Sequence, residues 1–136
     1  MKTILPIALF LLFTLGACSK NQRQVRKIDG KWNVVEADIQ GYGETDPDII
    51  YKFEFCRLRQ DEFCDFSIHN FDTDDIRTGI YSIDDRGTTL TLTISDGFGF
   101  LYREYTIERL SSRKLVFTNP NVPNGEFSRI VLRKVD

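Results

Sequence analysis

Histidine, methionine and tryptophan each occur once among the 136 residues, and cysteine occurs three times. The single histidine, His69, has no neighbouring cysteine or second histidine, so the pattern does not indicate a zinc site. A Ser-His-Asp or Cys-His catalytic group would have to be built around that one residue. Nothing in the sequence looks like a nucleophile elbow or a glycine-rich phosphate loop. We therefore expect a non-enzymatic protein with no catalytic residues, no metal and no cofactor.

A strong charge of either sign is also lacking. The chain has 18 basic and 20 acidic residues, for a formal net charge of −2. The basic residues are scattered, which argues against a nucleic-acid partner. Three acidic residues, Asp72, Asp74 and Asp75, are close together in the sequence, as in a calcium-binding loop. However, this segment lacks a glycine at the sixth loop position, and Ile83 stands where a bidentate glutamate belongs, so we expect a solvated loop.

Long hydrophobic runs are confined to the N-terminus. Lys2 precedes an apolar stretch from Ile4 to Leu15 that only Pro6 and Thr14 interrupt. A helix of about twelve residues spans roughly 18 Å. The hydrocarbon core of a bilayer is about 30 Å thick, so the run is typical of a signal peptide rather than of a membrane-spanning helix.

The run ends in Leu15-Gly16-Ala17-Cys18, which resembles the lipobox of bacterial lipoproteins. This resemblance implies cleavage before Cys18 and attachment of acyl chains such as palmitate to that residue. Several chains, at about 0.8 kcal/mol per buried CH₂, would make the anchoring effectively permanent. The alternative is an ordinary secretory signal in which Cys18 is incidental.

The following segment is polar and basic. We expect residues 1–17 to be the signal peptide, residues 18–28 a flexible basic tether, and residues 29–136 one domain. The tether could be simply solvated, or its basic residues could contact anionic headgroups, at about 1 kcal/mol each. Ser19 is not the aspartate that retains many lipoproteins in an inner membrane, and no acidic export signal follows Cys18. The expected location is therefore the outer membrane of a Gram-negative envelope, facing the periplasm.

The rest of the chain has the periodicity of strands. Leu90, Leu92 and Ile94 alternate with threonines, which is typical of a strand with one buried face. Turn residues recur at short intervals, and no long stretch has a helical period. The pattern predicts about eight strands, over residues 31–39, 50–58, 63–70, 79–83, 88–95, 98–110, 114–118 and 127–135. We expect an all-β, antiparallel, up-and-down eight-stranded barrel, with a β-sandwich as the alternative.

The first strand changes its apolar face midway. Trp32 and Val34 share one face, whereas Val35, Ala37 and Ile39 share the other. A strand with this pattern needs a bulge or a sharp bend. Barrels use such a strand to supply side chains to both ends of the core.

The start of this strand, Gly30-Lys31-Trp32, resembles the Gly-x-Trp start of lipocalins. Two later segments, 79–83 and 105–112, also look like the corresponding hairpins of small bacterial lipocalin-like lipoproteins. The resemblance implies an up-and-down barrel that binds a small apolar molecule. In lipocalins a late basic residue packs on the tryptophan, which makes Arg129 or Arg133 a candidate. If Ile130 and Leu132 face inward, however, both arginines face outward.

Aromatic residues make up 12% of the chain, and their use decides whether the barrel is hollow. We expect Trp32 to plug one end of the core. An eight-stranded barrel is just wide enough to be filled by side chains or to hold one small ligand, and both possibilities remain open. The candidate ligand-cavity residues are Phe53, Phe55, Phe66, Leu92 and Tyr102.

Cys56 and Cys64 flank a predicted hairpin tip, and an oxidising periplasm would allow them to form a disulfide. Pairing residue 56 with 64 brings the sulfurs together but sets Phe55 opposite Asp65. A one-residue slip pairs Phe55 with Phe66 but separates the sulfurs. A bulge over residues 62–64 would reconcile the two registers.

Two functions are compatible with these features. The first is a monomeric, membrane-anchored lipoprotein that binds a small hydrophobic ligand. The second is a non-enzymatic protein-interaction module of the envelope, such as a hydrolase inhibitor or an accessory subunit. In that case loops 41–48, 71–77 and 119–126 would form the contact surface.

Overall fold

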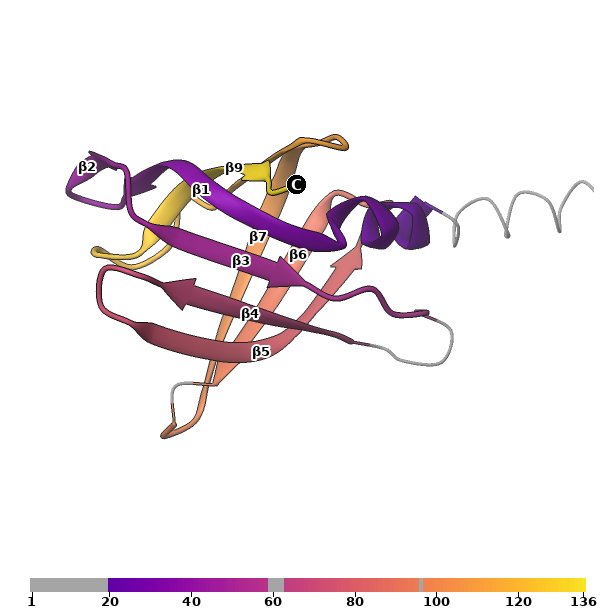
Figure 1. Ribbon diagram of the computed structural model, residues 1–136, viewed down its shortest axis with the longest axis horizontal. Helices are drawn as coiled ribbons and strands as arrows, with labels where there is room; N and C mark the ends of the chain where they lie inside the picture. The colour runs from indigo at the N-terminus through magenta and orange to yellow at the C-terminus, as the bar shows by residue number, and fades with distance from the viewer. Residues whose placement is uncertain (1–19, 59–62, 96) are drawn as a thin grey trace, which may run out of the picture.

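The computed structural model describes residues 20–58, 63–95 and 97–136 (Figure 1). The expected signal peptide and Cys18 lie outside the described residues. Within the described residues nine strands follow one another: β1 (Gly30–Ile39), β2 (Gly43–Thr45), β3 (Ile49–Phe53), β4 (Cys64–Asn70), β5 (Asp75–Asp84), β6 (Thr89–Ser95), β7 (Phe100–Leu110), β8 (Lys114–Thr118) and β9 (Phe127–Lys134).

Eight of these strands form a closed antiparallel barrel. From β3 to β9 each strand pairs with the next, β3 also pairs with β1, and β9 pairs with β1 to close the sheet. The short β2 is an additional strand on the far part of β1. The predicted up-and-down eight-stranded barrel is therefore confirmed, with one extra strand, and the sandwich alternative is wrong.

The predicted irregularity in β1 is present. The register between β1 and β9 shifts between Val34 and Glu36. Trp32, Val34 and Ala37 are all buried, which strict alternation would not allow. The bulge lets one strand serve both ends of the core.

On the N-terminal side of Gly79, β5 and β6 are not paired, which leaves a split in the wall of the closed barrel. β5 pairs with β4 from Asp75 onward, but its pairing with β6 begins only at Gly79. A Cβ atom at Gly79 would lie 2.2 Å from the backbone oxygen of Thr93 and 2.8 Å from the Phe66 ring, so only glycine allows this close approach. Beyond this point the end of the β6–β7 hairpin diverges from β5 and projects from the barrel, at the bottom of Figure 1.

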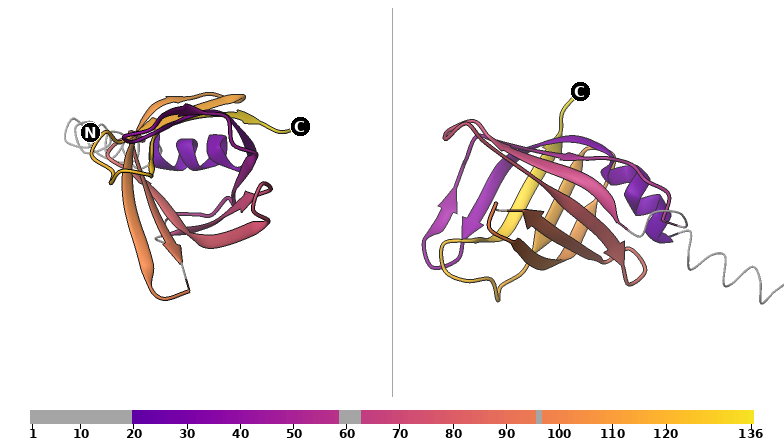
Figure 2. Two further views of the ribbon diagram at one scale, coloured as in Figure 1. Left: turned by 90° about the vertical axis from the view of Figure 1, so that its left-hand side faces the viewer. Right: turned by 90° about the horizontal axis from the view of Figure 1, so that it is seen from below.

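The N-terminal segment differs from the expected flexible tether. Residues 20–28 form a helix that lies across one end of the barrel, as the left view of Figure 2 shows. Val25 and Ile28 are completely buried in the core. The tether expectation is therefore wrong for these residues, because two apolar side chains one turn apart give the helix a buried face. We call this end of the barrel the closed end, and the opposite end the mouth.

Three amide side chains fasten the helix to the barrel rim. Asn21 accepts a hydrogen bond from the backbone nitrogen of Gly87 at 2.7 Å, and Gln24 donates to the carbonyl oxygen of Gly87 at 3.0 Å. Gln22 donates to the carbonyl oxygen of Cys56 at 3.1 Å and accepts from the nitrogen of Leu58 at 3.0 Å. The helix is thus bonded to loops that lie far apart in the sequence, and it closes this end.

Trp32 lies in the core at the closed end, as predicted, with no exposed surface. Its indole nitrogen donates a hydrogen bond to the carbonyl oxygen of Ile28 at 2.7 Å. The basic residue that packs on its ring is Lys134 and neither of the two candidates, Arg129 and Arg133. Because Ile130 and Leu132 face inward, strand alternation brings position 134 to the same side.

Cys56 and Cys64 form a disulfide, with 5.4 Å between their Cα atoms. The hairpin uses neither of the two registers considered above, because Phe53 pairs with Phe66. This register packs both rings inside the barrel. The disulfide forms beyond the end of β3, where residue 56 is no longer bound by strand pairing.

Candidate functional site

The closed half of the barrel is filled by side chains. The rings of Phe53 and Tyr81 meet edge to face at 5.1 Å between centroids, and those of Phe53 and Phe66 stack at 5.9 Å. Leu92 is also buried, with 2% of its surface exposed. Three of the five residues predicted to line a ligand cavity therefore belong to the packed core.

The other two predicted cavity residues lie outside the barrel. Phe55 is 40% exposed and Tyr102 is 58% exposed, so both assignments are wrong. Phe55 follows the end of β3, where the alternation of the strand no longer applies. On β7 the inward side chains are those at odd positions, since Tyr105 is buried and Arg103 points into the mouth, which turns Tyr102 outward.

A cavity of about 250 Å³ occupies the mouth half of the barrel. Its wall combines apolar and aromatic side chains with charged and amide groups. The lining residues are Ile49, Tyr51, Ile68, Asn70, Asp75, Arg77, Ile94, Leu101, Arg103, Tyr105, Gly125, Glu126 and Phe127. None of the five predicted cavity residues is among them.

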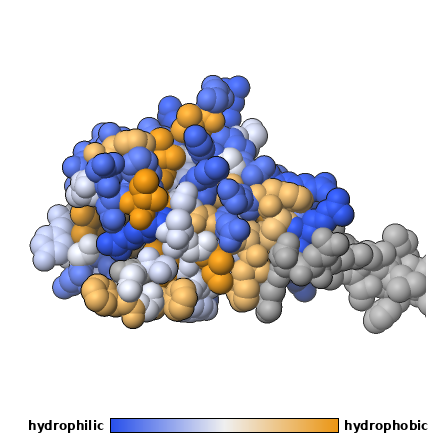
Figure 3. Space-filling view, turned by 60° about the horizontal axis from the view of Figure 1, so that its bottom comes forward, coloured by the Kyte–Doolittle hydropathy of each residue, from blue (hydrophilic) through white to orange (hydrophobic). Residues whose placement is uncertain are grey.

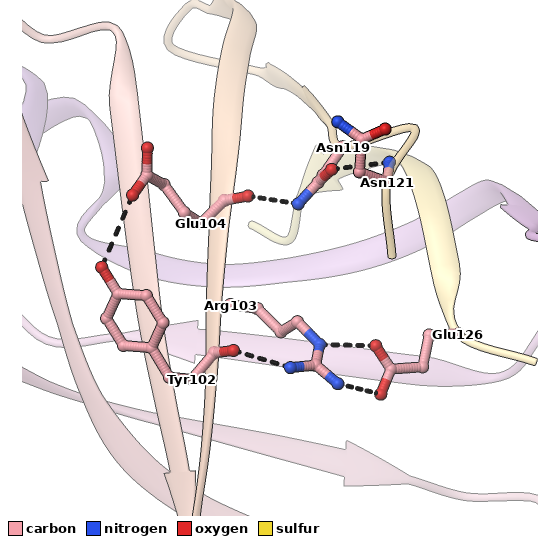
Figure 4. A network of polar contacts seen from close by, with 6 residues as sticks. All are labelled: Tyr102, Arg103, Glu104, Asn119, Asn121 and Glu126. Carbon is pink, nitrogen blue, oxygen red and sulfur yellow. Dashed lines mark hydrogen bonds and ion pairs between the residues drawn. The ribbon is translucent and has the colours of Figure 1, made fainter. Parts of the chain in front are cut away.

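An ion pair between Arg103 and Glu126 forms one side of this cavity (Figure 4). The Arg103 Nε and Nη2 atoms donate to the two Glu126 carboxylate oxygens at 2.5 and 2.6 Å, and Nη1 donates to the carbonyl oxygen of Tyr102 at 2.8 Å. The hydrogen bonds to Glu126 raise the pKa of the Arg103 guanidinium. The pair is thus fixed in a bidentate geometry, and each charge compensates the other.

Two tyrosines face the cavity beside this ion pair. Tyr51 is 4% exposed and Tyr105 is 7% exposed. In the described part of the chain, no hydrogen bond joins either hydroxyl group to another residue. Burial raises the pKa of Tyr105 to about 12, with a further contribution from the charge of Glu126, and burial also raises the pKa of Tyr51. Both phenols therefore stay protonated at neutral pH and present polar groups to the cavity.

Sequence reasoning missed these four residues for an identifiable reason. β7 carries aromatic side chains on both faces, so its alternation alone does not tell which face is inside. The signal that could have found the site is the spacing of Leu101, Arg103 and Tyr105 on one face. An arginine in such an inward row requires an acidic partner from another segment.

A second hollow of about 530 Å³ lies on the outer surface beside the split at Gly79. Its wall combines polar side chains such as Ser67 and Thr78 with the exposed ring of Phe100. The hairpin end next to it also carries Phe98, which is fully exposed. Figure 3 shows pale orange, apolar atoms at its lower left, where this hairpin projects.

Acidic side chains gather in two other places. Ligand atoms of Glu36, Asp38 and Glu44 lie within 4.8 Å of one another, so these residues could hold a cation. In the second place, the loop of residues 71–75, Asp74 contacts His69 at 3.4 Å and Asp75 contacts Arg77 at 3.0 Å. The geometry of that loop therefore directs two of its carboxylates to basic side chains.

Comparisons of the chain with protein-family models, with curated proteins and with solved structures find no match. Within residues 20–58, 63–95 and 97–136, no helix has the length and apolar character needed to cross a membrane.

Proposed function

We propose that this protein is a lipid-anchored, periplasm-facing binding protein whose mouth cavity takes a small, neutral, amphipathic molecule. The observation that carries the proposal is the pair of buried phenols, Tyr51 and Tyr105, whose hydroxyl groups face the cavity without a hydrogen-bond partner among the described residues. Ligand sites combine an apolar lining with a few polar groups that fix the orientation of the ligand, so the two hydroxyls favour a ligand with a polar group at that position. The lipid anchor is supported by the lipobox at residues 15–18.

The size of the cavity limits the ligand. Pockets for drug-sized molecules have volumes of about 300–1,000 Å³, whereas this cavity measures about 250 Å³. An apolar cavity of about 150 Å³ is known to hold a benzene molecule. The volume therefore favours a molecule of one or two small rings, and it is too small to enclose a long acyl chain.

The charges beside the phenols favour a neutral ligand. Glu126 already compensates the Arg103 guanidinium through two hydrogen bonds. A carboxylate placed between the phenols would lie near the Glu126 carboxylate and would gain little from Arg103. A hydroxyl or carbonyl group can instead accept a hydrogen bond from either phenol, and the apolar part of the wall can cover the rest of the molecule.

Ligand-induced stabilisation tests this proposal. Thermal unfolding of the purified protein should be measured with indole and cyclohexanone as neutral probes and with benzoate and palmitate as anionic ones. A neutral probe at about 100 times its dissociation constant stabilises the fold by about 2.7 kcal/mol. We expect a shift with the neutral probes only. No shift with any probe, together with no small molecule in a native mass spectrum of freshly isolated protein, would contradict the proposal.

The tyrosines provide the matched variants. Replacing both cavity phenols, as Tyr51→Phe with Tyr105→Phe, removes two hydrogen-bonding groups at about 0.5–1.5 kcal/mol each, so affinity should fall by about fivefold to about 150-fold. The variant Tyr102→Phe makes the same chemical change at a ring that is 58% exposed outside the barrel. Its affinity should equal that of the unmodified chain.

A second function, protein interaction, is favoured by the aromatic end of the β6–β7 hairpin. Phe98 is fully exposed there, and Phe100 is 79% exposed. Large exposed apolar groups are enriched at interaction sites. Affinity capture from a bacterial envelope with the intact protein and with Phe98→Ser/Phe100→Ser tests this function. A protein partner retained by the first and lost by the second would support it, and equal capture would contradict it.

A further inference from the structure

The four charged residues of the N-terminal helix are all basic and all exposed. Lys20, Arg23, Arg26 and Lys27 lie on the side of the helix that faces away from the barrel, whereas Val25 and Ile28 face the core. Residues 20–28 contain no acidic side chain. The helix therefore gives the closed end a cationic outer surface, which we call the basic face.

The mouth carries the opposite charge. Loops 41–48 and 71–75 contain six acidic residues and no basic one, namely Glu44, Asp46, Asp48, Asp72, Asp74 and Asp75. Both loops lie at the left of Figure 1, and the helix lies at the right. The two arginines that line the mouth are paired with acids, Arg77 with Asp75 and Arg103 with Glu126.

The charges near the basic face do not cancel it. The turn between β5 and β6 contributes Asp84 and Asp85 together with Arg86, and the Asp29 carboxylate accepts a hydrogen bond from the backbone nitrogen of Phe55 at 3.1 Å. Lys134 adds a further positive charge, although its ammonium group is turned toward Trp32. The net charge of the whole chain is only −2. The positive charges of the helix and the negative charges of the two loops therefore give the molecule a cationic end and an anionic end.

The expected lipid attachment site, Cys18, is close in the sequence to the helix at this end. Cys18 precedes the first described helical residue, Lys20, by two positions. Two residues span at most about 7 Å. A lipid carried by Cys18 would therefore hold the basic face within reach of the headgroups, because the helix is bonded to the barrel rather than free to swing.

We propose that the basic face docks on an anionic lipid surface and that the mouth points away from the bilayer. The occupant is a membrane containing anionic phospholipid, which attracts the basic residues at the closed end and repels the acidic loops at the mouth. This inference rests on the proposed lipid anchor. It implies that a ligand reaches the mouth cavity from the aqueous side and not from the bilayer.

Lysine labelling of the lipidated full-length protein tests the docking. The protein should be reconstituted into vesicles of phosphatidylcholine alone and of phosphatidylcholine mixed with phosphatidylglycerol. A water-soluble acetylating reagent then reports the accessibility of Lys20 and Lys27 by peptide mass spectrometry. We expect both lysines to react at least threefold more slowly on the anionic vesicles, and salt should remove the difference because it screens exposed charges.

Charge reversal supplies the matched variants. Arg23→Glu with Arg26→Glu changes the basic face without touching the buried side of the helix, and it should abolish the protection of Lys20 and Lys27. Lys52→Glu with Arg109→Glu makes the same total change in charge at exposed positions on the barrel wall, and protection should persist. Equal labelling of the lipidated protein on both vesicles, or equal protection in both variants, would overturn the docking while leaving the anchor intact. A mature chain whose intact mass shows no lipid would overturn the anchor and the docking together, and ligand binding by the cavity is measured independently of both.

Discussion

The ammonium group of Lys134 lies 5.2 Å from the centroid of the Trp32 ring, at the closed end of the barrel. The same group donates a hydrogen bond to the carbonyl oxygen of Lys27 at 3.2 Å. Gly30 leaves room for the lysine side chain, since a Cβ atom there would lie 2.9 Å from the Lys134 Cε atom. The last strand, the first strand and the helix are thus joined through one side chain.

Replacing this lysine should destabilise the fold modestly. A cation–π contact contributes about 0.5–1 kcal/mol at an exposed site, and the hydrogen bond to the helix adds to it. We expect Lys134→Met to lower the free energy of unfolding by about 1 kcal/mol in urea denaturation. The control Arg133→Met alters a neighbouring exposed side chain. An equal loss of stability in both variants would show that the contact with Trp32 contributes nothing.

Truncating the helix contact should have a larger effect. Ile28 has no exposed surface, and its carbonyl oxygen accepts the hydrogen bond from Trp32. Removing a buried isoleucine side chain to alanine costs about 2–5 kcal/mol. We expect Ile28→Ala to fall in this range, as measured by urea denaturation.

The matched control for the helix is Lys27→Ala, which removes an exposed side chain but keeps the backbone oxygen that Lys134 contacts. Its effect should stay within about 0.5 kcal/mol. If Ile28→Ala were as mild as this control, residues 20–28 would behave as a tether in solution.

The barrel could be predicted from the sequence, but the helix could not. Alternation such as that of Leu90, Leu92 and Ile94 is a local signal, and the bulge in β1 follows from its change of apolar face. A helix of nine residues is marginal by itself, and this one has only two strong apolar side chains. Its remaining inward residues, such as Gln22 and Gln24, look solvated in the sequence because their partners lie far along the chain.

The candidate site could be predicted only in part. The sequence predicts that a ligand site would lie inside the barrel. Which aromatic side chains point inward depends on the register of each hairpin, because a slip of one residue turns every side chain of a strand to its other face. Phe53 and Phe66 were assigned to the interior and do lie there. The prediction for Tyr102 is wrong because Tyr102 and Tyr105 place aromatic rings on both faces of β7. Alternation along the strand therefore does not tell which ring points inward. Glu126 comes from a loop, where no periodicity gives its direction.

The disulfide should make a measurable contribution to stability. Cys56 and Cys64 are separated by eight positions along the chain. A closed loop of this size corresponds to about 2–3 kcal/mol in the chain-entropy model. We expect Cys56→Ala with Cys64→Ala to lower the free energy of unfolding by this amount. Thiol counting on the denatured, unreduced protein should find no free thiol from this pair, and two free thiols would contradict the bridge.

Alkaline pH should destabilise the protein through its buried phenols. Burial raises the pKa of Tyr105 to about 12, and burial also raises the pKa of Tyr51 and Tyr81. In the unfolded chain each phenol has a pKa near 10. Above about pH 10 the unfolded state therefore loses protons that the folded state keeps, so unfolding is favoured as the pH rises.

The slope of this pH dependence provides the test. Each fully buried phenol lowers the free energy of unfolding by up to about 1.4 kcal/mol per pH unit, from about pH 10 until its folded-state pKa is reached. Urea denaturation between about pH 9 and about pH 11 should show a flat region followed by this decline. Tyr105→Phe should reduce the steepness of the decline, since one ionising group is removed from the unfolded state. Stability that stays constant through this range would mean that the phenols are already accessible to water in the folded protein, which would also contradict their burial beside the mouth cavity.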